Sequence, residues 1–153
     1  MALSVKSTAF AEGNPIPKKH SCQGSDVSPA LSWEGIPAGA KSIALIVDDP
    51  DAPGGTWVHW VAYNIPSTLR GLPEAVPDQR VLDNGIRQGK NDFGKIGYGG
   101  PCPPPGPVHR YYFKVYALNS ILEVEAGATK AQLETAMKSR ILAEGRLMGT
   151  YRR

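Results

Sequence analysis

The sequence has 153 residues, of which 41% are hydrophobic and 20% are charged, and its net charge at pH 7 is +3. This composition fits one globular domain, which we expect to span residues 1–153, and it excludes disordered and collagen-like chains. The positive charges are scattered, with no run of five or more like charges, so no arm that binds nucleic acid is predicted.

The N-terminal residues 1–6 do not form the continuous apolar segment of a secretory signal, and no stretch of 18 apolar residues follows. We therefore expect no membrane span and a cytoplasmic location. The two cysteines, Cys22 and Cys102, would stay free thiols in a reducing cytoplasm. The alternative is a disulfide that closes a loop of roughly 80 residues.

Residues 42–48 form the first clearly predicted strand. They are almost continuously apolar, as in a strand that is buried on both faces. The strand runs into three closely spaced carboxylates, Asp48, Asp49 and Asp51, and then Pro53. A solvated turn is the simpler interpretation. The alternative is that one carboxylate turns inward, where it orients a histidine or binds an ammonium group of a ligand.

Residues 57–65 are predicted to form a second strand, because they are rich in aromatic and β-branched side chains. Alternation along this strand would place Trp57, His59, Val61 and Tyr63 on one face. A single histidine in such a strand is more often a core residue than a ligand-binding group. His59 is therefore a candidate site residue only in combination with other polar residues.

A long segment, residues 85–108, contains seven glycines and five prolines. A loop of this length without its own elements is usually functional or disordered, and because prolines stiffen this one we interpret it as a structured, site-forming loop. It leads into a third predicted strand, residues 109–117, in which alternation puts His109 and Tyr111 on one face. These two side chains are well placed to line a pocket beside the loop.

One main helix is predicted in the C-terminal half of the chain. Thr129 and Gln132 match a capping box, apolar residues recur at helical spacing as far as Ile141, and Gly145 stands where a C-terminal cap is expected. No helices separate the predicted strands, so a parallel α/β sheet is not indicated. We predict a β-rich α+β fold, a compact single domain built around antiparallel β-sheets with this one helix.

Several spaced motifs occur in a fixed order: Asp49-Pro50-Asp51-Ala52-Pro53, Trp57-Val58-His59-Trp60, Gly97-Tyr98-Gly99-Gly100-Pro101-Cys102 and His109-Arg110-Tyr111. Together they resemble the motif series of the phosphatidylethanolamine-binding (Raf-kinase-inhibitor-like) family, most closely its bacterial and archaeal branch. The resemblance covers nearly the whole chain. It implies a compact fold with a small surface cavity that binds phosphate, phosphorylated headgroups or similar anions.

The resemblance also implies which residues line that cavity: Asp49, Pro53, His59, Pro101, Cys102, His109 and Tyr111. The register at Pro101 and Cys102 is open by one residue, because the length of this loop varies in the family. Protonated histidine and the tyrosine hydroxyl supply the donors that phosphate oxygens require. This interpretation needs no cofactor and no metal, and the expected ligand of the cavity is a small anion or a phospholipid headgroup.

Longer eukaryotic relatives carry a C-terminal helix over the mouth of the pocket, whereas this sequence stops soon after Tyr151. We expect an open mouth, or a second copy of the chain in place of the lid, and therefore a homodimer. Some family members inhibit serine proteases or bind kinases, so regulation of such a protein partner is a further expectation.

Two enzymatic interpretations stay open beside the non-enzymatic one. Cys102 with His59 or His109 could act as a thiol nucleophile and its base in a hydrolase, although no oxyanion-hole motif accompanies them. Asp49 and the two histidines could instead ligate zinc or iron in a metal-binding enzyme. A last expectation concerns the backbone: the tight turn that brings Pro53 next to Asp49 predicts a cis peptide bond before this proline.

Overall fold

A five-stranded antiparallel sheet forms the centre of the molecule in the computed structural model, which describes residues 2–153. The order of its strands is β6-β4-β3-β7-β8, and a smaller antiparallel sheet has the order β1-β2-β5. The large sheet contains β3 (Ser42–Asp49), β4 (Trp57–Pro66), β6 (Arg87–Gln88), β7 (His109–Leu118) and β8 (Ile141–Tyr151). The remaining elements are β1 (Ser4–Lys6), η1 (Lys18–His20), β2 (Leu31–Glu34), β5 (Gly71–Leu72) and α1 (Lys130–Met137).

The three strands predicted from the sequence are present as β3, β4 and β7. Every residue of β3 is buried, because this strand lies between β4 and β7 and both of its faces are covered. In β7, buried and less buried residues alternate, with His109 and Tyr111 on the buried side. Both burial patterns agree with those expected from the sequence, and the β-rich α+β fold is confirmed.

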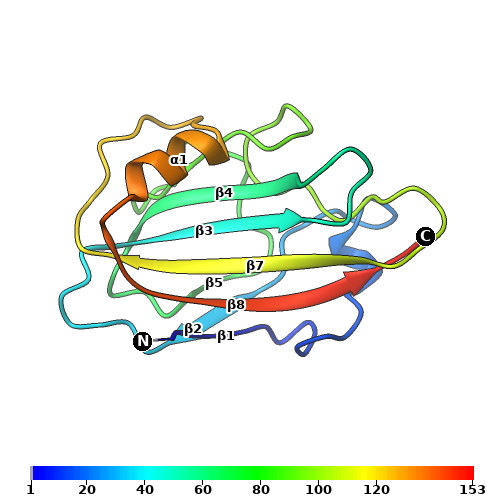
Figure 1. Ribbon diagram of the computed structural model, residues 1–153, viewed down its shortest axis with the longest axis horizontal. Coiled ribbons are helices and arrows are strands. Elements are labelled where there is room, and N and C mark those ends of the chain that lie inside the picture. The colour runs from blue at the N-terminus through cyan, green and yellow to red at the C-terminus, as the bar shows by residue number, and fades with distance from the viewer. Residues whose placement is uncertain (1) are drawn as a thin grey trace.

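Two apolar cores hold the layers together. On one face of the large sheet, Trp33 of the small sheet packs in the same cluster as Leu45, Trp60 and Phe113. On the other face, the apolar side of α1 packs against the sheet, and Figure 1 shows this helix next to β4. Among residues 2–153, no helix is long and apolar enough to cross a membrane.

The capping box of α1 is confirmed. The hydroxyl of Thr129 accepts a hydrogen bond from the Gln132 backbone N–H at 3.2 Å, and the Gln132 side chain accepts one from the Thr129 N–H at 2.9 Å. The helix nevertheless ends at Met137, earlier than predicted. The chain turns away because Lys138 has an extended ψ of 133° and Ser139 a positive φ of 63°.

The prediction that Gly145 caps this helix was wrong, because Gly145 lies in the middle of β8, opposite Val115 of β7. The last strand was therefore missed by the sequence analysis. Glycine is needed at this position for a different reason: a Cβ atom there would lie 2.1 Å from the carbonyl oxygen of Leu3. Such a contact is far inside van der Waals distance, so only glycine lets the N-terminal segment approach the edge of β8.

Candidate functional site

A cavity of about 240 Å³ opens at the end of the large sheet where β3 ends and β4 and β7 begin. Its lining consists of Asp49, Ala52, Pro53, Trp57, His59, Phe93, Cys102, Pro103, Pro104, His109 and Tyr111. Six of the seven residues assigned to the site from the sequence therefore meet around one cavity. Pro101 is buried but does not line the cavity, whereas the neighbouring Pro103 and Pro104 do.

The three carboxylates at the end of β3 and just after it have different partners, which relieves their mutual repulsion. Asp48 is buried on the helix side of the sheet, where its carboxylate accepts hydrogen bonds from Lys114 at 3.1 Å and Lys130 at 2.8 Å. Asp51 forms a two-pronged ion pair with Arg110, with bonds of 2.9 and 2.8 Å. This pairing lowers the pKa of Asp51 to about 2. Only Asp49 turns into the cavity.

Asp49 holds His109 in one orientation. Its Oδ2 accepts a 2.7 Å hydrogen bond from Nδ1 of His109, and its Oδ1 accepts one of 2.7 Å from the backbone N–H of Asp51. The side chains of Asp49 and His109 are both almost fully buried. Because Nδ1 donates to the carboxylate, Nε2 is the ring nitrogen of His109 that remains for a ligand.

The predicted cis peptide bond before Pro53 was wrong, because no cis bond occurs among the described residues. The turn is made by other means. The Asp49 carboxylate accepts the N–H of Asp51 at 2.7 Å, and Gly54 and Gly55 adopt positive φ angles of 84° and 120°. Glycine reaches such angles without steric cost, so the turn closes with trans peptides.

A β-bulge at His59, which lines the cavity, breaks the alternation along β4. Val47 of β3 pairs with Trp60 and Asp48 pairs with Val58, so His59 is the extra residue on β4. A bulge of this kind redirects a side chain relative to strict alternation. The prediction that Val61 and Tyr63 share the face of His59 was therefore wrong, because both pack on the helix side of the sheet.

The ring of His59 is fixed by the loop that follows β6. Its Nδ1 lies 2.7 Å from the carbonyl oxygen of Gly99, which can only accept, so Nδ1 carries the proton and Nε2 is the acceptor of the neutral ring. Burial lowers the pKa of His59, although the Gly99 hydrogen bond and the charge of Asp49 oppose this effect. Burial therefore favours the neutral form, whose Nε2 accepts a hydrogen bond.

The hydroxyl of Tyr111 is buried and has no hydrogen-bond partner among the residues that the structure describes. The ring is stacked on His109, with centroids 6.5 Å apart, and meets the ring of His59 edge-on at 5.1 Å. Burial and the neighbouring charge of Asp49 raise the pKa of Tyr111, so the hydroxyl stays protonated at neutral pH. An unpartnered buried hydroxyl is unfavourable, and a ligand that accepts a hydrogen bond from it would remove the cost.

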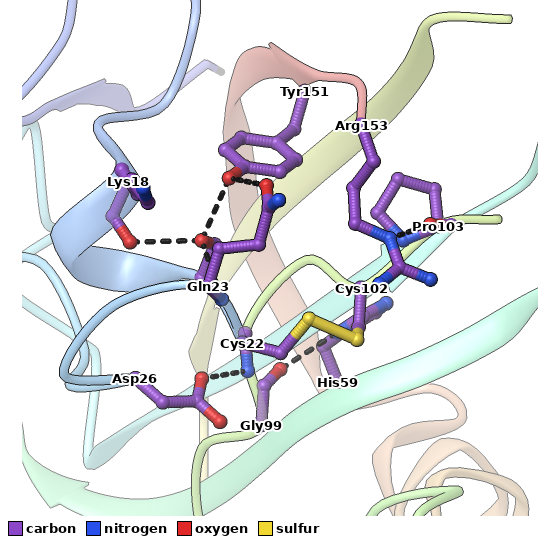
Figure 2. Close-up of a disulfide and its surroundings, with 12 residues drawn as sticks. Lys18, Cys22, Gln23, Asp26, His59, Gly99, Cys102, Pro103, Tyr151 and Arg153 are labelled. Atoms are coloured by element: carbon purple, nitrogen blue, oxygen red, sulfur yellow. Dashed lines mark hydrogen bonds between the residues drawn. A yellow bond between two sulfur atoms is a disulfide. The ribbon is translucent and has the colours of Figure 1, made fainter. Parts of the chain in front are cut away.

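A disulfide between Cys22 and Cys102 anchors the glycine- and proline-rich wall of the cavity (Figure 2), and the expectation of free thiols was wrong. The Cα atoms are 5.3 Å apart, within the range that a disulfide spans. The approach is set by hydrogen bonds between the same two segments: Cys22 N–H donates to the Pro101 carbonyl at 3.0 Å, and Gly100 N–H donates to Asp26 at 2.8 Å.

The end of β8 closes the same corner of the molecule. The hydroxyl of Tyr151 contacts the side chains of Ser21 and Gln23, and Arg153 donates from Nε to the carbonyl of Pro103 at 2.6 Å. Figure 2 shows Gln23, Tyr151 and Arg153 around the disulfide. The wall is thus held by segments from both ends of the described chain.

Phe93 is a cavity residue that the sequence analysis missed. Its turn is fixed by the buried Asn91, whose side chain accepts from the Phe93 N–H at 3.0 Å and donates to the Gly97 carbonyl at 2.9 Å. The ring of Phe93 lies edge-on to His59 at 5.4 Å and to Trp57 at 5.6 Å. A large aromatic residue inside the glycine-rich segment was the available signal.

This geometry does not support the two enzymatic interpretations, a cysteine–histidine hydrolase and a metal-binding enzyme. Cys102 is in the disulfide, so its sulfur carries no thiolate in this state. Within residues 2–153, no group of three or more histidine, cysteine or acidic side chains is arranged to hold a metal ion. In particular, Asp49 is already engaged by His109 and by the Asp51 N–H.

Comparisons with known proteins identify similar sequences along nearly the whole chain. The family model described as "Phosphatidylethanolamine-binding protein" matches residues 6–152. A UPF0098 protein of Methanothermobacter thermautotrophicus is 50% identical over 151 residues, which cover 99% of both chains. A UPF0098 protein of Aquifex aeolicus is 49% identical over 99% of this chain and 89% of its own length.

Solved structures extend the similarity to the whole fold. A phosphatidylethanolamine-binding protein homologue from Chlamydia trachomatis has a TM-score of 0.90 and 46% identity, covering 99% of this chain and 98% of its own. YbcL of E. coli, described as a member of the mammalian family, has a TM-score of 0.91 and 36% identity, covering 100% and 99%. The chain belongs to the phosphatidylethanolamine-binding protein family.

Proposed function

We propose that this member of the phosphatidylethanolamine-binding protein family is a non-enzymatic binding protein that holds a phosphate group in the cavity. The observation that carries the proposal is the buried hydroxyl of Tyr111, which has no partner among the described residues and lies beside the hydrogen-bonded pair of His109 and Asp49. A buried polar group of this kind is satisfied when an acceptor enters the cavity.

The side chains offer both donors and an acceptor to such a ligand. Tyr111 donates through its hydroxyl, and protonated His109 donates through Nε2 while Asp49 balances the charge of its ring. His59 is favoured in the neutral form by burial, and its Nε2 accepts. The best ligand therefore has acceptor oxygens and one acidic O–H.

Phosphate fits this pattern better than other common anions. A phosphate monoester has a second pKa of about 6, so a fraction of it carries a proton near neutral pH. Sulfate has the same tetrahedral shape but no proton at this pH. The neutral Nε2 of His59 would face an oxygen lone pair of sulfate instead of an O–H group. We therefore expect the site to prefer phosphate over sulfate.

The site is proposed to bind its ligand without cleaving it. Cys102, the candidate nucleophile, is bridged to Cys22. The hydroxyl of Tyr111 is a poor nucleophile, because burial and the charge of Asp49 keep its pKa high. The remaining groups orient a phosphate without attacking it.

Calorimetric titration with inorganic phosphate and with sulfate tests the proposal, on the oxidised protein and on His109→Ala. We expect phosphate to bind more tightly than sulfate. In the variant, loss of a charge-assisted hydrogen bond should weaken phosphate binding by about 1.5–3 kcal/mol. Equal phosphate affinity in the two proteins would overturn the proposal.

Three further expectations belong to this proposal. A homodimer would cover the open mouth of the cavity, and light scattering at high concentration would reveal it. Regulation of a protease or kinase is implied by the family resemblance, and pull-downs would test it. The cytoplasm remains the proposed location. Because mesophilic cytosols keep thiols reduced whereas hyperthermophiles retain intracellular disulfides, this location agrees with the disulfide only if the cytosol allows such a bond to persist.

A further inference from the structure

We propose that Phe93 and Trp57 form an aromatic wall that makes the cavity selective for phosphate monoesters of apolar alcohols, above all aromatic ones. The inference rests on the proposed phosphate site and concerns the alcohol group to which the bound phosphate is esterified. Phosphoethanolamine and free phosphate would bind more weakly than an aryl phosphate.

The cavity is larger than a phosphate ion needs. Its volume of about 240 Å³ is many times the roughly 10–15 Å³ that one water molecule requires, whereas a phosphate ion has only five heavy atoms. The polar groups that could contact a phosphate are contributed by four residues, Asp49, His59, His109 and Tyr111. A phosphate bound to them leaves the rest of the space for the group that it esterifies.

That remaining space is lined by carbon. The other lining residues are Ala52, Pro53, Trp57, Phe93, Pro103 and Pro104, together with the bridged Cys102. Trp57 and Phe93 are 38% and 40% exposed, although large aromatic residues gain most from burial. An apolar substituent on the ligand would cover these two rings and release the water on them.

The two rings are held ready for a flat partner. They meet edge-on at 5.6 Å, and Phe93 also contacts the ring of His59 edge-on at 5.4 Å. Phe93 packs directly over Gly99, where a Cβ atom would lie 2.6 Å from the ring. Because Asn91 fixes the turn that carries Phe93, an aromatic substituent would meet a surface that is already formed.

The cavity offers no free carboxylate to the ammonium group of a phosphoethanolamine headgroup. Asp49 is the carboxylate among the lining residues, and its two oxygens already accept from His109 and from the Asp51 N–H. The nearby carboxylate of Asp51 is paired with Arg110 through both of its oxygens. An ammonium group that entered this space would share the Asp49 carboxylate with His109 and the Asp51 N–H, and would therefore recover only part of the hydration that it loses.

Titrations with phenyl phosphate, phosphoethanolamine and inorganic phosphate test the inference on four proteins. These are the wild type, Phe93→Ala, Phe93→Leu and Ile121→Ala, the last as a control because Ile121 is 64% exposed and does not line this cavity. In the wild type, phenyl phosphate should bind about tenfold more tightly than phosphoethanolamine, as expected for one aromatic contact plus burial.

The variants separate this wall from the phosphate site. Phe93→Ala should remove the preference for phenyl phosphate by weakening that ligand more than inorganic phosphate, Phe93→Leu should retain part of the preference, and Ile121→Ala should retain all of it. A wild type that binds phenyl phosphate no better than phosphoethanolamine overturns the inference, as does a Phe93→Ala variant that weakens all three ligands equally. If none of the three ligands binds, the phosphate site itself fails.

A separate measurement distinguishes a lipid from a soluble molecule as the source of the phosphate ester. Wild type and Phe93→Ala are sedimented with phosphatidylcholine vesicles that contain phosphatidic acid, a phosphate monoester of an apolar alcohol. Co-sedimentation that depends on Phe93 supports the inference and identifies a lipid as the source. No co-sedimentation, together with tight binding of phenyl phosphate, supports it with a soluble ester.

Discussion

His109, at the start of β7, donates a 2.7 Å hydrogen bond to Asp49, at the end of β3, although 60 positions separate them in the sequence. The two strands are antiparallel neighbours, so the end of one lies beside the start of the other. The resulting pair is buried and sets which nitrogen of His109 faces a ligand.

Replacing Tyr111 with phenylalanine should separate binding from stability. The hydroxyl has no partner among residues 2–153, so its loss should leave the free energy of unfolding unchanged or raise it by up to about 1 kcal/mol. Phosphate binding should weaken by about tenfold, because a donor to the ligand is removed. Urea unfolding and calorimetry on the same protein check this, and a strongly destabilised variant would contradict it.

His59→Asn should make the protein less sensitive to acid. Burial lowers the pKa of His59 below its ordinary value of 6.5, so between these two values the unfolded chain binds a proton that the folded chain does not. The free energy of unfolding then falls as pH drops below 6.5, by at most about 1.4 kcal/mol per pH unit for this group.

In the variant, the asparagine amide can still donate to Gly99, but it has no proton to gain. Urea unfolding between pH 7 and pH 5 should therefore show a shallower loss of stability than in the wild type. His20 and His109 are present in both proteins, so the two profiles compare chains that differ only at position 59. Parallel profiles would show that His59 is not the group responsible.

Reduction of the disulfide should destabilise the protein and loosen the wall of the cavity. The bridge closes a loop with a sequence separation of 80 residues, which corresponds to about 4 kcal/mol in the free energy of unfolding. Unfolding with and without a dithiol measures the effect. The double variant Cys22→Ser/Cys102→Ser serves as the control, because its stability should not respond to the dithiol at all.

Gly100→Ala should disrupt the wall, whereas Gly39→Ala should be tolerated. A Cβ atom at position 100 would lie 2.1 Å from the His20 carbonyl oxygen and 2.4 Å from Asp26. At position 39 the nearest atom, on Leu142, would be 3.9 Å away, an ordinary contact. We expect Gly100→Ala to lose at least about 2 kcal/mol of stability and most phosphate binding. Similar stabilities for the two variants would contradict this account.

The strands that could be predicted are those whose burial leaves a regular pattern. β3 is covered on both faces and β7 on one, and each produces its own periodicity. The strands β1, β2, β5 and β6 are two to four residues long, too short for a period to appear. In β8, Gly145 looked like the end of a helix, because a glycine demanded by a distant backbone contact resembles a capping glycine.

For the site too, local sequence patterns predicted some positions, whereas positions that depend on long-range contacts could not be predicted. Alternation correctly placed His109 and Tyr111 together. It failed along β4 after His59, because no local pattern specifies the bulge that adds one residue opposite β3. The partners of Asp49 and Cys22 depend on how segments 60 and 80 residues apart meet, and neither contact has a local signal.

The position of β8 has a consequence for biosynthesis. Tyr151 of β8 pairs with His109 and contacts Ser21, so the corner behind the cavity forms only when residues early and late in the described chain come together. A ribosome adds about 5–20 residues per second, and until β8 has emerged the nascent chain exposes the unpaired edge of β7. Chaperones that shield such edges would therefore act until β8 has emerged and paired with β7.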